Sequence, residues 1–287
     1  MINLTIQRLD RTLTMVLDLD PALPNEATVL SWFNGGNLYE PDVSDLMLRV
    51  LAPGDTVLDV GANIGFFSAL AGLLVGPTGQ TVAFEPDPRN RARLLRNLQL
   101  NSLSAVTVLD AAVTAAAGDV TFFLNSDDTG GSALWDPGTM DQNVASRRDR
   151  QALTVPGVTL DDTMRRLALA PPKLLKIDTE GAEHRVLMGA SALLASRQVP
   201  YIVAELHEFG LASMGSSQQA LRAHMARFGY DTYALYLDGS LPKLIPPGSR
   251  LNLRVAVNVL FSTQQAVAAA WPEEPFDPRT TLPAGIG

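Results

Sequence analysis

The sequence contains no cysteine among its 287 residues. Disulfide bonds, thiolate nucleophiles and metal sites with cysteine ligands are therefore excluded. It also has no excess of basic residues, because 22 Lys and Arg stand against 30 Asp and Glu, which gives a formal net charge of −8. Binding to nucleic acid or to an anionic membrane relies on basic residues that neutralise phosphates, so we expect neither partner.

Long apolar runs are missing as well. The chain has no stretch of about 18 apolar residues that could cross a bilayer. Its first ten residues lack the basic and then apolar pattern of a signal peptide. We therefore expect a cytoplasmic protein. Hydrophobic residues make up 46% of the chain and charged residues 18%, which is typical of a folded globular protein and not of a disordered one.

The hydrophobic pattern switches between strand-like and helix-like spacing. Residues 1–20 predict two half-buried strands in a hairpin. Further along, apolar runs alternate with helical stripes, and these runs lie at residues 56–60, 81–84, 106–109, 174–178 and 201–206. Such alternation is typical of βαβ units, which form a parallel sheet with helices on both faces. Two late runs, 233–237 and 254–261, have no clear helix between them and predict an antiparallel closing pair.

The polar segment 125–151 interrupts this alternation. A connection of that length is usually a functional lid or a disordered excursion. Trp135 within it could stack on a ligand ring. A basic cluster in the same segment could attract an anionic ligand, although a solvated loop explains it equally well; this cluster consists of Arg147, Arg148 and Arg150.

The first candidate binding site is the stretch 59–65, which reads DVGANIG. It lies where a strand turns into a helix, so its glycines allow close approach to the backbone and the helix N-terminus offers free N–H groups. The dinucleotide fingerprint G-x-G-x-x-G is absent, because Asn63 stands where the middle glycine would be. An acid beside the turn suits a ligand with an ammonium group. The structural alternative is a tight turn that only packs the helix on the sheet.

Two further acids follow the next two strands. Glu85 comes about 20 residues after the glycines, where a carboxylate can accept both hydroxyls of a ribose. Asp110 ends the third strand and could read an adenine edge or serve only as a turn residue. Because such sheets bind ligands at the carboxyl ends of their strands, these residues together indicate a site for a nucleoside that carries an amino acid.

This constellation resembles the S-adenosylmethionine-dependent methyltransferases, and longer motifs resemble their FkbM family. The motifs are residues 39–41 (YEP), 57–67 (VLDVGANIGFF), 84–86 (FEP), 175–183 (LKIDTEGAE) and 204–207 (AELH). The resemblance covers roughly residues 38–262, and the block at 175–183 is its most specific part. It implies S-adenosyl-L-methionine as the cofactor and methylation of a hydroxyl on a small molecule such as a sugar or a polyketide.

Together with the hydrophobic pattern, the resemblance predicts an α/β fold. We expect a Rossmann-like, seven-stranded and mostly parallel sheet with an antiparallel closing strand, helices on both faces and a small N-terminal β/α extension. The expected regions are a β-hairpin extension over 1–37, a class I methyltransferase domain over 38–262 and a C-terminal tail over 263–287.

The resemblance also implies which residues hold the donor. They would lie at or near strand ends: Asp59, Gly61, Asn63 and Gly65 at the methionine part, Glu85 at the ribose, Asp110 and Ala111 beside the adenine, and Glu40 closing over the donor from upstream.

Methyl transfer to a hydroxyl needs a proton acceptor near the reacting oxygen, because an alcohol is a poor nucleophile. The candidate catalytic residues are Asp178, Glu180 and His207, after the fourth and fifth strands. The two acids could hold the acceptor or take its proton, and histidine titrates near neutrality. The same three could ligate a divalent cation, but nothing in their spacing demands one and we assign no metal. Glu183 is better explained as a charge in the first turn of a helix.

Two other function classes stay open on the residues alone. A nicotinamide-dependent oxidoreductase could use a similar sheet, although the missing middle glycine argues against it. A non-catalytic binding module could keep the same fold. Binding of S-adenosylmethionine separates the first hypothesis from both.

Overall fold

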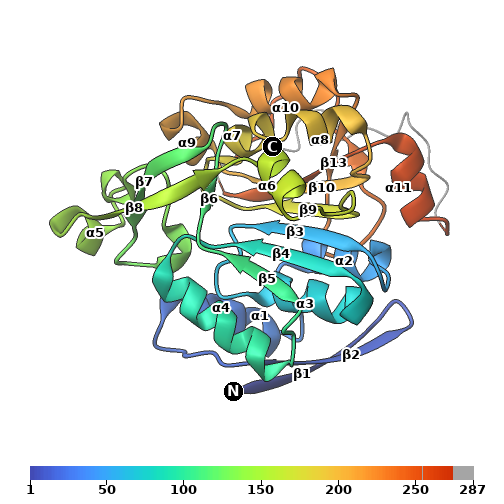
Figure 1. The fold of residues 1–287 in the computed structure, drawn as a ribbon, viewed down its shortest axis with the longest axis horizontal. Coiled ribbons are helices and arrows are strands. Elements are labelled where there is room, and N and C mark those ends of the chain that lie inside the picture. Colours follow the sequence, from blue (N-terminus) through green and yellow to red (C-terminus); the bar gives the residue numbers. More distant parts are fainter. Residues whose placement is uncertain (254, 274–287) are drawn as a thin grey trace.

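The computed structural model describes residues 1–253 and 255–273. A mixed eight-stranded sheet forms its centre, with helices on both faces (Figure 1). In spatial order its strands are β12 (Lys243–Leu244), β11 (Asp231–Ala234), β13 (Val257–Ser262), β10 (Tyr201–Leu206), β9 (Leu174–Ile177), β3 (Thr56–Val60), β4 (Gln80–Phe84) and β5 (Val106–Leu109). Neighbours from β10 to β5 are parallel, whereas β13 is antiparallel to β10 and β11, and β12 is antiparallel to β11.

The predicted α/β class, with helices on both faces of a sheet, is confirmed, but the predicted count of seven strands is wrong. The additional strand, β12, has only two residues and pairs with the outer edge of β11. A strand that short shows no period-two pattern in the sequence. The predicted start of the last run, at residue 254, lies outside the described residues, as do residues 274–287 of the expected tail.

Two hydrophobic cores lie on opposite faces of the sheet. The first core is covered by α1 (Pro24–Asn34), α2 (Pro41–Val50), α3 (Phe66–Val75), α4 (Pro88–Leu100) and α11 (Gln264–Ala270). The second is covered by α6 (Leu160–Arg166), α7 (Glu183–Met188), α8 (Ser191–Ser196), α9 (Glu208–Ser213) and α10 (Gln218–Arg227). Because successive side chains of a strand point to opposite faces, Val57 of β3 joins the first core and Leu58 joins the second.

The N-terminal extension packs into the first core. Strands β1 (Ile2–Arg8) and β2 (Arg11–Leu17) form the predicted antiparallel hairpin, in which Leu4 lies opposite Met15. Met15 is fully buried in the same core as α3. Helix α1 is held to α4 by an ion pair, since the Arg93 guanidinium donates two 2.7 Å hydrogen bonds to the carboxylate of Glu26.

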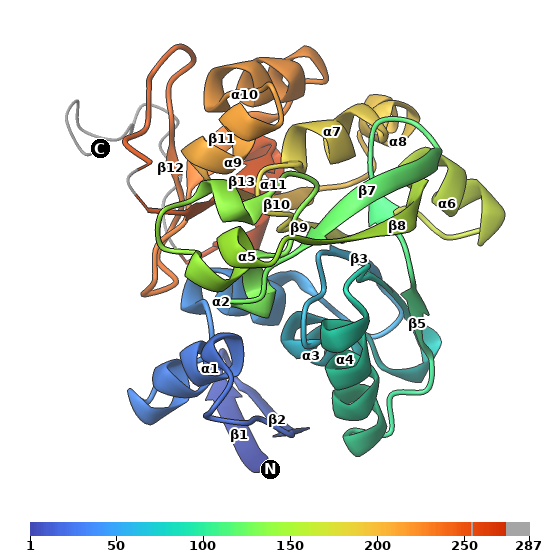
Figure 2. The same cartoon turned by 90° about the vertical axis from the view of Figure 1, so that its left-hand side faces the viewer.

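A second sheet, which the sequence analysis did not predict, stands beside the first. It contains β6 (Ala112–Val113), β8 (Gln151–Val158) and β7 (Gly118–Leu124) in that order. Strands β7 and β8 pair antiparallel, so residues 125–150 of the polar segment are the connection of a long hairpin. It carries three short helical turns, η2 (Thr129–Gly131), η3 (Pro137–Thr139) and α5 (Val144–Arg148). Figures 1 and 2 show this hairpin projecting from the sheet at one end of the strands.

The strand order reverses between β3 and β9, because the chain builds outward from β3 through β4 to β5 and then returns to place β9 on the other side. In open α/β sheets a crevice forms at the carboxyl ends of the strands at such a switch point. Across the described residues, no helix combines the length and the hydrophobicity that crossing a bilayer requires.

The ion pair that fastens α1 gives a prediction about stability. Glu26 is 1% exposed, and its removal leaves the Arg93 guanidinium without these two hydrogen bonds. We expect Glu26→Ala to lower the free energy of unfolding by about 2–4 kcal/mol, the usual cost of removing one partner of a buried charged pair. Thermal unfolding measures the loss, with the exposed Asn34→Ala on the same helix as the control. Equal melting temperatures for the two variants would contradict a stabilising role for the ion pair between Glu26 and Arg93.

Candidate active site

A cavity of about 460 Å³ opens at the carboxyl ends of β3, β4, β9 and β10. This volume lies in the range of small-molecule sites. Turns that follow the strands form its floor, whereas α1 and the 125–151 segment contribute its cover. Figure 2 shows α5 and its neighbouring turns in front of these strands.

Most of the predicted site residues line this cavity. They are Glu40, Gly61, Asn63, Glu85, Ala111, Asp178, Glu180 and His207. The ends of separate strands therefore bring together residues that are more than 160 positions apart in the chain, from Glu40 to His207.

Three predicted donor residues do not line the cavity. Asp59 is 1% exposed and accepts a 2.6 Å hydrogen bond from the Ser68 hydroxyl of α3, because it shares the α3 face of the sheet. Gly65 caps the N-terminus of α3 and packs against α4. Asp110 has a side chain that is 58% exposed and forms an ion pair with Arg91 at 2.7 Å. A direct donor contact, as we predicted for each, has no support in this geometry.

The turn after β3 requires a glycine at position 61. Gly61 has φ of +81°, and a Cβ there would lie 1.7 Å from the backbone carbonyl oxygen of Asp178. Asn63 also takes a left-handed conformation, with φ of +53°. The close approach of the β3 and β9 turns, which only glycine permits, places their backbones side by side on the floor of the cavity.

Glu85 supports this turn from the end of β4. One carboxylate oxygen accepts the Asn63 N–H at 2.6 Å and the other accepts the Asp87 N–H at 2.8 Å. Burial raises the pKa of Glu85 to about 8, although these two hydrogen bonds act in the opposite direction. In the ionised form each oxygen has one further lone pair, so the Glu85 carboxylate can then accept hydroxyl groups of a ligand in the cavity.

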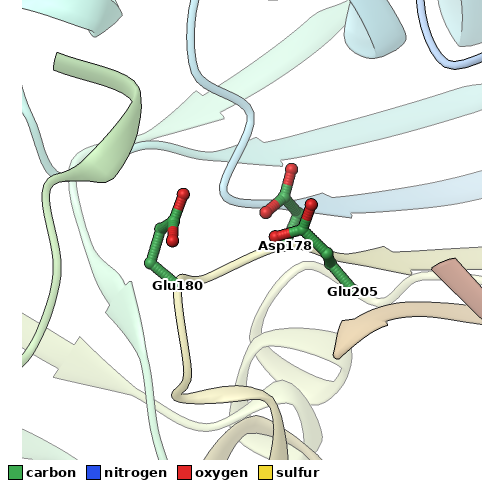
Figure 3. A group of neighbouring side chains, drawn as sticks. All are labelled: Asp178, Glu180 and Glu205. Carbon is green, nitrogen blue, oxygen red and sulfur yellow. The ribbon is translucent and has the colours of Figure 1, made fainter. Parts of the chain in front are cut away.

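Three carboxylates meet where β9 and β10 end. Oxygens of Asp178, Glu180 and Glu205 all lie within 4.8 Å of one another (Figure 3). Glu205 is a site residue that our sequence analysis did not single out. A signal for it existed, because Ala204 pairs with Ile177 in the parallel register and the next residues are Glu205 and Asp178. These three carboxylates can ligate a cation, with Glu205 in place of the His207 that the sequence analysis considered as a possible ligand, and we assign no metal.

A buried ammonium group balances these acids. Lys176 of β9 is 3% exposed, and its Nζ lies 3.0 Å from an Asp178 carboxylate oxygen and 4.7 Å from the centre of the Phe67 ring. Burial acts against its charge, but the carboxylates of Asp178, Asp59 and Glu40 outweigh burial and raise the pKa of Lys176. Lys176 therefore stays charged beneath the cavity floor.

Burial raises the pKa of the other acids at this end. The pKa of Glu40 rises to about 7, with Lys176 opposing the rise and Asp178 adding to it. The pKa of Glu205 lies well above its ordinary value, through burial and then the charge of Asp178. That of Glu180 rises to about 8, also through burial and then Asp178. Near neutral pH the cavity therefore holds carboxyl groups that can either donate or accept a proton.

Glu180 lies between His207 and the covering segment. One of its carboxylate oxygens is 3.9 Å from Nδ1 of His207, whose pKa burial lowers. Its backbone carbonyl accepts a 2.5 Å hydrogen bond from Nε1 of Trp135. Glu180 also has a left-handed backbone, with φ of +55°. Trp135 thus orders the loop that carries Glu180 as well as lining the cavity.

Glu183 has a more specific structural role than a charge at a helix start. It is fully buried, and one oxygen accepts hydrogen bonds from the Thr179 N–H, the Thr179 hydroxyl and the Gly181 N–H. Burial raises the pKa of Glu183 to about 7. It therefore fixes the turn that presents Asp178 and Glu180.

The basic cluster of the covering segment lies outside the cavity lining. Arg147 forms an ion pair with Asp141 at 2.8 Å. Arg150 forms one with Asp136 at 2.9 Å and stacks over the Phe123 ring. These arginines fasten the segment to itself, which favours the structural explanation of the cluster over the attraction of an anionic ligand.

The raised pKa of Glu180 predicts how stability depends on pH. The folded protein keeps this carboxyl protonated up to about pH 8, whereas the unfolded chain ionises it near its ordinary pKa of 4.5. Its contribution is therefore present at low pH and is lost as the pH rises through about 8.

We expect Glu180→Gln, which cannot ionise, to gain about 1–3 kcal/mol in stability over the wild type between about pH 5.5 and about pH 8.5. Thermal unfolding of the ligand-free protein at both pH values measures the gain, with the exposed Glu208→Gln as the control. A difference between Glu180→Gln and wild type that stays constant with pH would contradict the shift.

The sequence of this chain also matches known proteins. Residues 59–232 match the family model of the methyltransferase FkbM domain. The chain is 32% identical over 230 residues to the 31-O-demethyl-FK506 methyltransferase FkbM of Streptomyces tacrolimicus, a match that covers 70% of this chain and 86% of that protein. It is 25% identical over 169 residues to the hexuronic acid methyltransferase AglP of Haloferax volcanii, covering 58% of this chain and 62% of AglP.

The match therefore spans less than two thirds of AglP. Among solved structures, the methyltransferase FkbM of Methylobacillus flagellatus aligns with a TM-score of 0.45 and 15% identity, over 85% of this chain and 56% of that one. The family match over more than half of the chain confirms the resemblance seen in the motifs: this protein belongs to the FkbM family of methyltransferases.

Proposed function

We propose that this protein is an S-adenosylmethionine-dependent O-methyltransferase that acts on a hydroxyl group of a small molecule. The observation that carries the proposal is the buried carboxylate of Glu85, which faces a cavity at the strand ends next to the glycine turn at Gly61. The names of two relatives, a hexuronic acid methyltransferase and a 31-O-demethyl-FK506 methyltransferase, support a sugar or a polyketide as the acceptor class.

The donor end of the cavity fits a nucleoside with an amino-acid arm. Glu85 would hold the ribose through its free lone pairs, and Ala111 would lie beside the adenine. The turn at Gly61 and Asn63 lets the arm approach the backbone, and Glu40 covers it from the start of α2. When bound, the donor supplies a methyl group on a positively charged sulfur, so that the S–C bond breaks with its electron pair left on sulfur while an O–C bond forms.

The acceptor end supplies the proton acceptor. We assign this role to Glu180, because its carboxyl group lines the cavity and has a pKa of about 8, close to neutral pH, where a general base works best. His207 lies beside it and stays neutral because burial lowers its pKa. Asp178 and Glu205 would bind hydroxyl groups of the acceptor. A cationic donor near Glu180 would lower the pKa of that carboxyl group and favour the ionised base.

Donor binding gives the first test. We expect Glu85→Gln to weaken binding of S-adenosylhomocysteine by about 1–3 kcal/mol, because one oxygen that accepts a ribose hydroxyl becomes an amide donor. Isothermal titration calorimetry measures the loss, with Glu208→Gln on the outer surface as the control. No binding by the wild type at millimolar ligand would reject the proposed function. Enhanced NADH fluorescence would instead favour an oxidoreductase.

Turnover gives the second test. Glu180→Gln keeps the shape of the side chain but cannot take a proton, so we expect kcat to fall by about 10²–10⁴-fold. Its affinity for S-adenosylhomocysteine should stay within a few-fold of wild type, and His207→Asn should lower kcat by less. Transfer from a methyl-labelled donor to a panel of hydroxylated sugars and polyketides provides the assay. Unchanged turnover in Glu180→Gln would move the base elsewhere.

A further inference from the structure

We propose that Asn25, on helix α1 of the N-terminal extension, is a positioning residue of the donor site that joins the turn after β3 to the covering segment. The inference rests on the proposed function, since it concerns affinity for the same donor. Asn25 lies outside residues 59–232, which match the family model, so the match itself assigns it no role. It also lies outside the region that the sequence motifs covered.

The contacts of Asn25 are reciprocal and buried. Asn25 is only 6% exposed, and it lines the cavity. Its Nδ2 donates a 2.6 Å hydrogen bond to Oδ1 of Asn63, and its Oδ1 accepts a 3.3 Å hydrogen bond from Nδ2 of Asn63. The two amides therefore face each other and use both their donor and their acceptor groups, which fixes the rotation of each side chain.

This contact matters because of where Asn63 lies. Asn63 has φ of +53°, a backbone conformation that few residues adopt without local support. Its N–H is also the group that holds one oxygen of Glu85. Asn25 thus stabilises the turn through the side chain of Asn63. The backbone of the same turn orients the carboxylate of Glu85, which we assign to the ribose. A turn held in place before binding lowers the ordering cost of ligand association.

The covering segment meets the same side chain. Nδ2 of Asn25 lies 3.4 Å from the hydroxyl of Thr129, and a Cβ on Gly130 would come within 3.3 Å of its Oδ1. Asn90 of α4 holds the backbone carbonyl of Thr129 at 3.0 Å. Helices α1 and α4 therefore both contact the η2 turn at Thr129, beside the donor end of the cavity.

The first turn of α1 is held in place by contacts of Glu26, as a positioning role for Asn25 requires. Glu26, the next residue, is paired with Arg93 of α4 and accepts the Asp20 N–H at 2.5 Å. These contacts attach α1 to α4 without using the side chain of Asn25. Replacing Asn25 should therefore change the donor site more than it changes the fold.

Binding of S-adenosylhomocysteine, followed by calorimetry, tests the inference. We expect Asn25→Ala to bind this ligand about 5- to 30-fold more weakly than wild type. Asn34→Ala, at the exposed end of the same helix, should bind within twofold of wild type. Without ligand, Asn25→Ala should melt at a lower temperature than Asn34→Ala, because the buried Asn63 amide loses its partner. The rise in melting temperature on adding the ligand should also be smaller for Asn25→Ala.

A double-mutant cycle separates positioning through Asn63 from an independent contact. If Asn25 acts through Asn63, the double variant Asn25→Ala/Asn63→Ala binds no more weakly than Asn63→Ala alone. Asn25→Asp, which keeps the size but loses the Nδ2 donor, should bind with intermediate affinity. It also serves in place of Asn25→Ala if that variant does not fold.

Three results would separately refute the role of Asn25, its action through Asn63 and the proposed function. Wild-type affinity in Asn25→Ala, with wild type binding the ligand normally, would refute the role of Asn25 and leave the proposed function intact. Losses that multiply in the double variant would refute the action through Asn63. No binding by wild type would reject the proposed function, and the inference with it.

Discussion

The buried ammonium of Lys176 is the interaction on which the site depends. It lies beneath the cavity floor, 3.0 Å from Asp178 and on the same face of the sheet as Asp59. Several carboxyl groups gather within reach of its charge, and without a counter-charge their burial would be much more costly. The fold provides this counter-charge from a strand interior, because alternation on β9 turns Lys176 toward α3 while its neighbours Leu175 and Ile177 fill the opposite core.

The cavity above this charge has two chemically different ends. At one end, Gly61 and Asn63 present backbone groups beside Glu85, an arrangement suited to a nucleoside and its polar arm. At the other, Glu180 and His207 present groups that can accept a proton. The hairpin of β7 and β8 and the helix α1 cover both, so segments at a distance from the family motifs complete the site.

Local sequence patterns predicted the strand ends and several of the lining residues, because a glycine turn or an acid after a strand can be recognised from neighbouring residues alone. The family resemblance implied direct donor contact for Asp59, whereas alternation along β3 places its side chain on the α3 face of the sheet, outside the cavity lining. Glu205 could also have been predicted as a site residue, because the parallel register of β10 against β9 places it beside Asp178. Asn25 could not, since its partner Asn63 is 38 residues away and no periodic pattern connects them. Strands β7 and β8 escaped prediction because their sequences, GDVTFFL and QALTVPGV, do not alternate regularly between apolar and polar residues.

A crystal structure of the protein with S-adenosylhomocysteine tests the central claim most directly. We expect the ribose hydroxyls to lie within hydrogen-bonding distance of Glu85, with the adenine beside Ala111 and the sulfur facing the carboxylates of Asp178 and Glu180. A ligand bound outside this cavity, or bound within it with its ribose away from Glu85, would contradict the account.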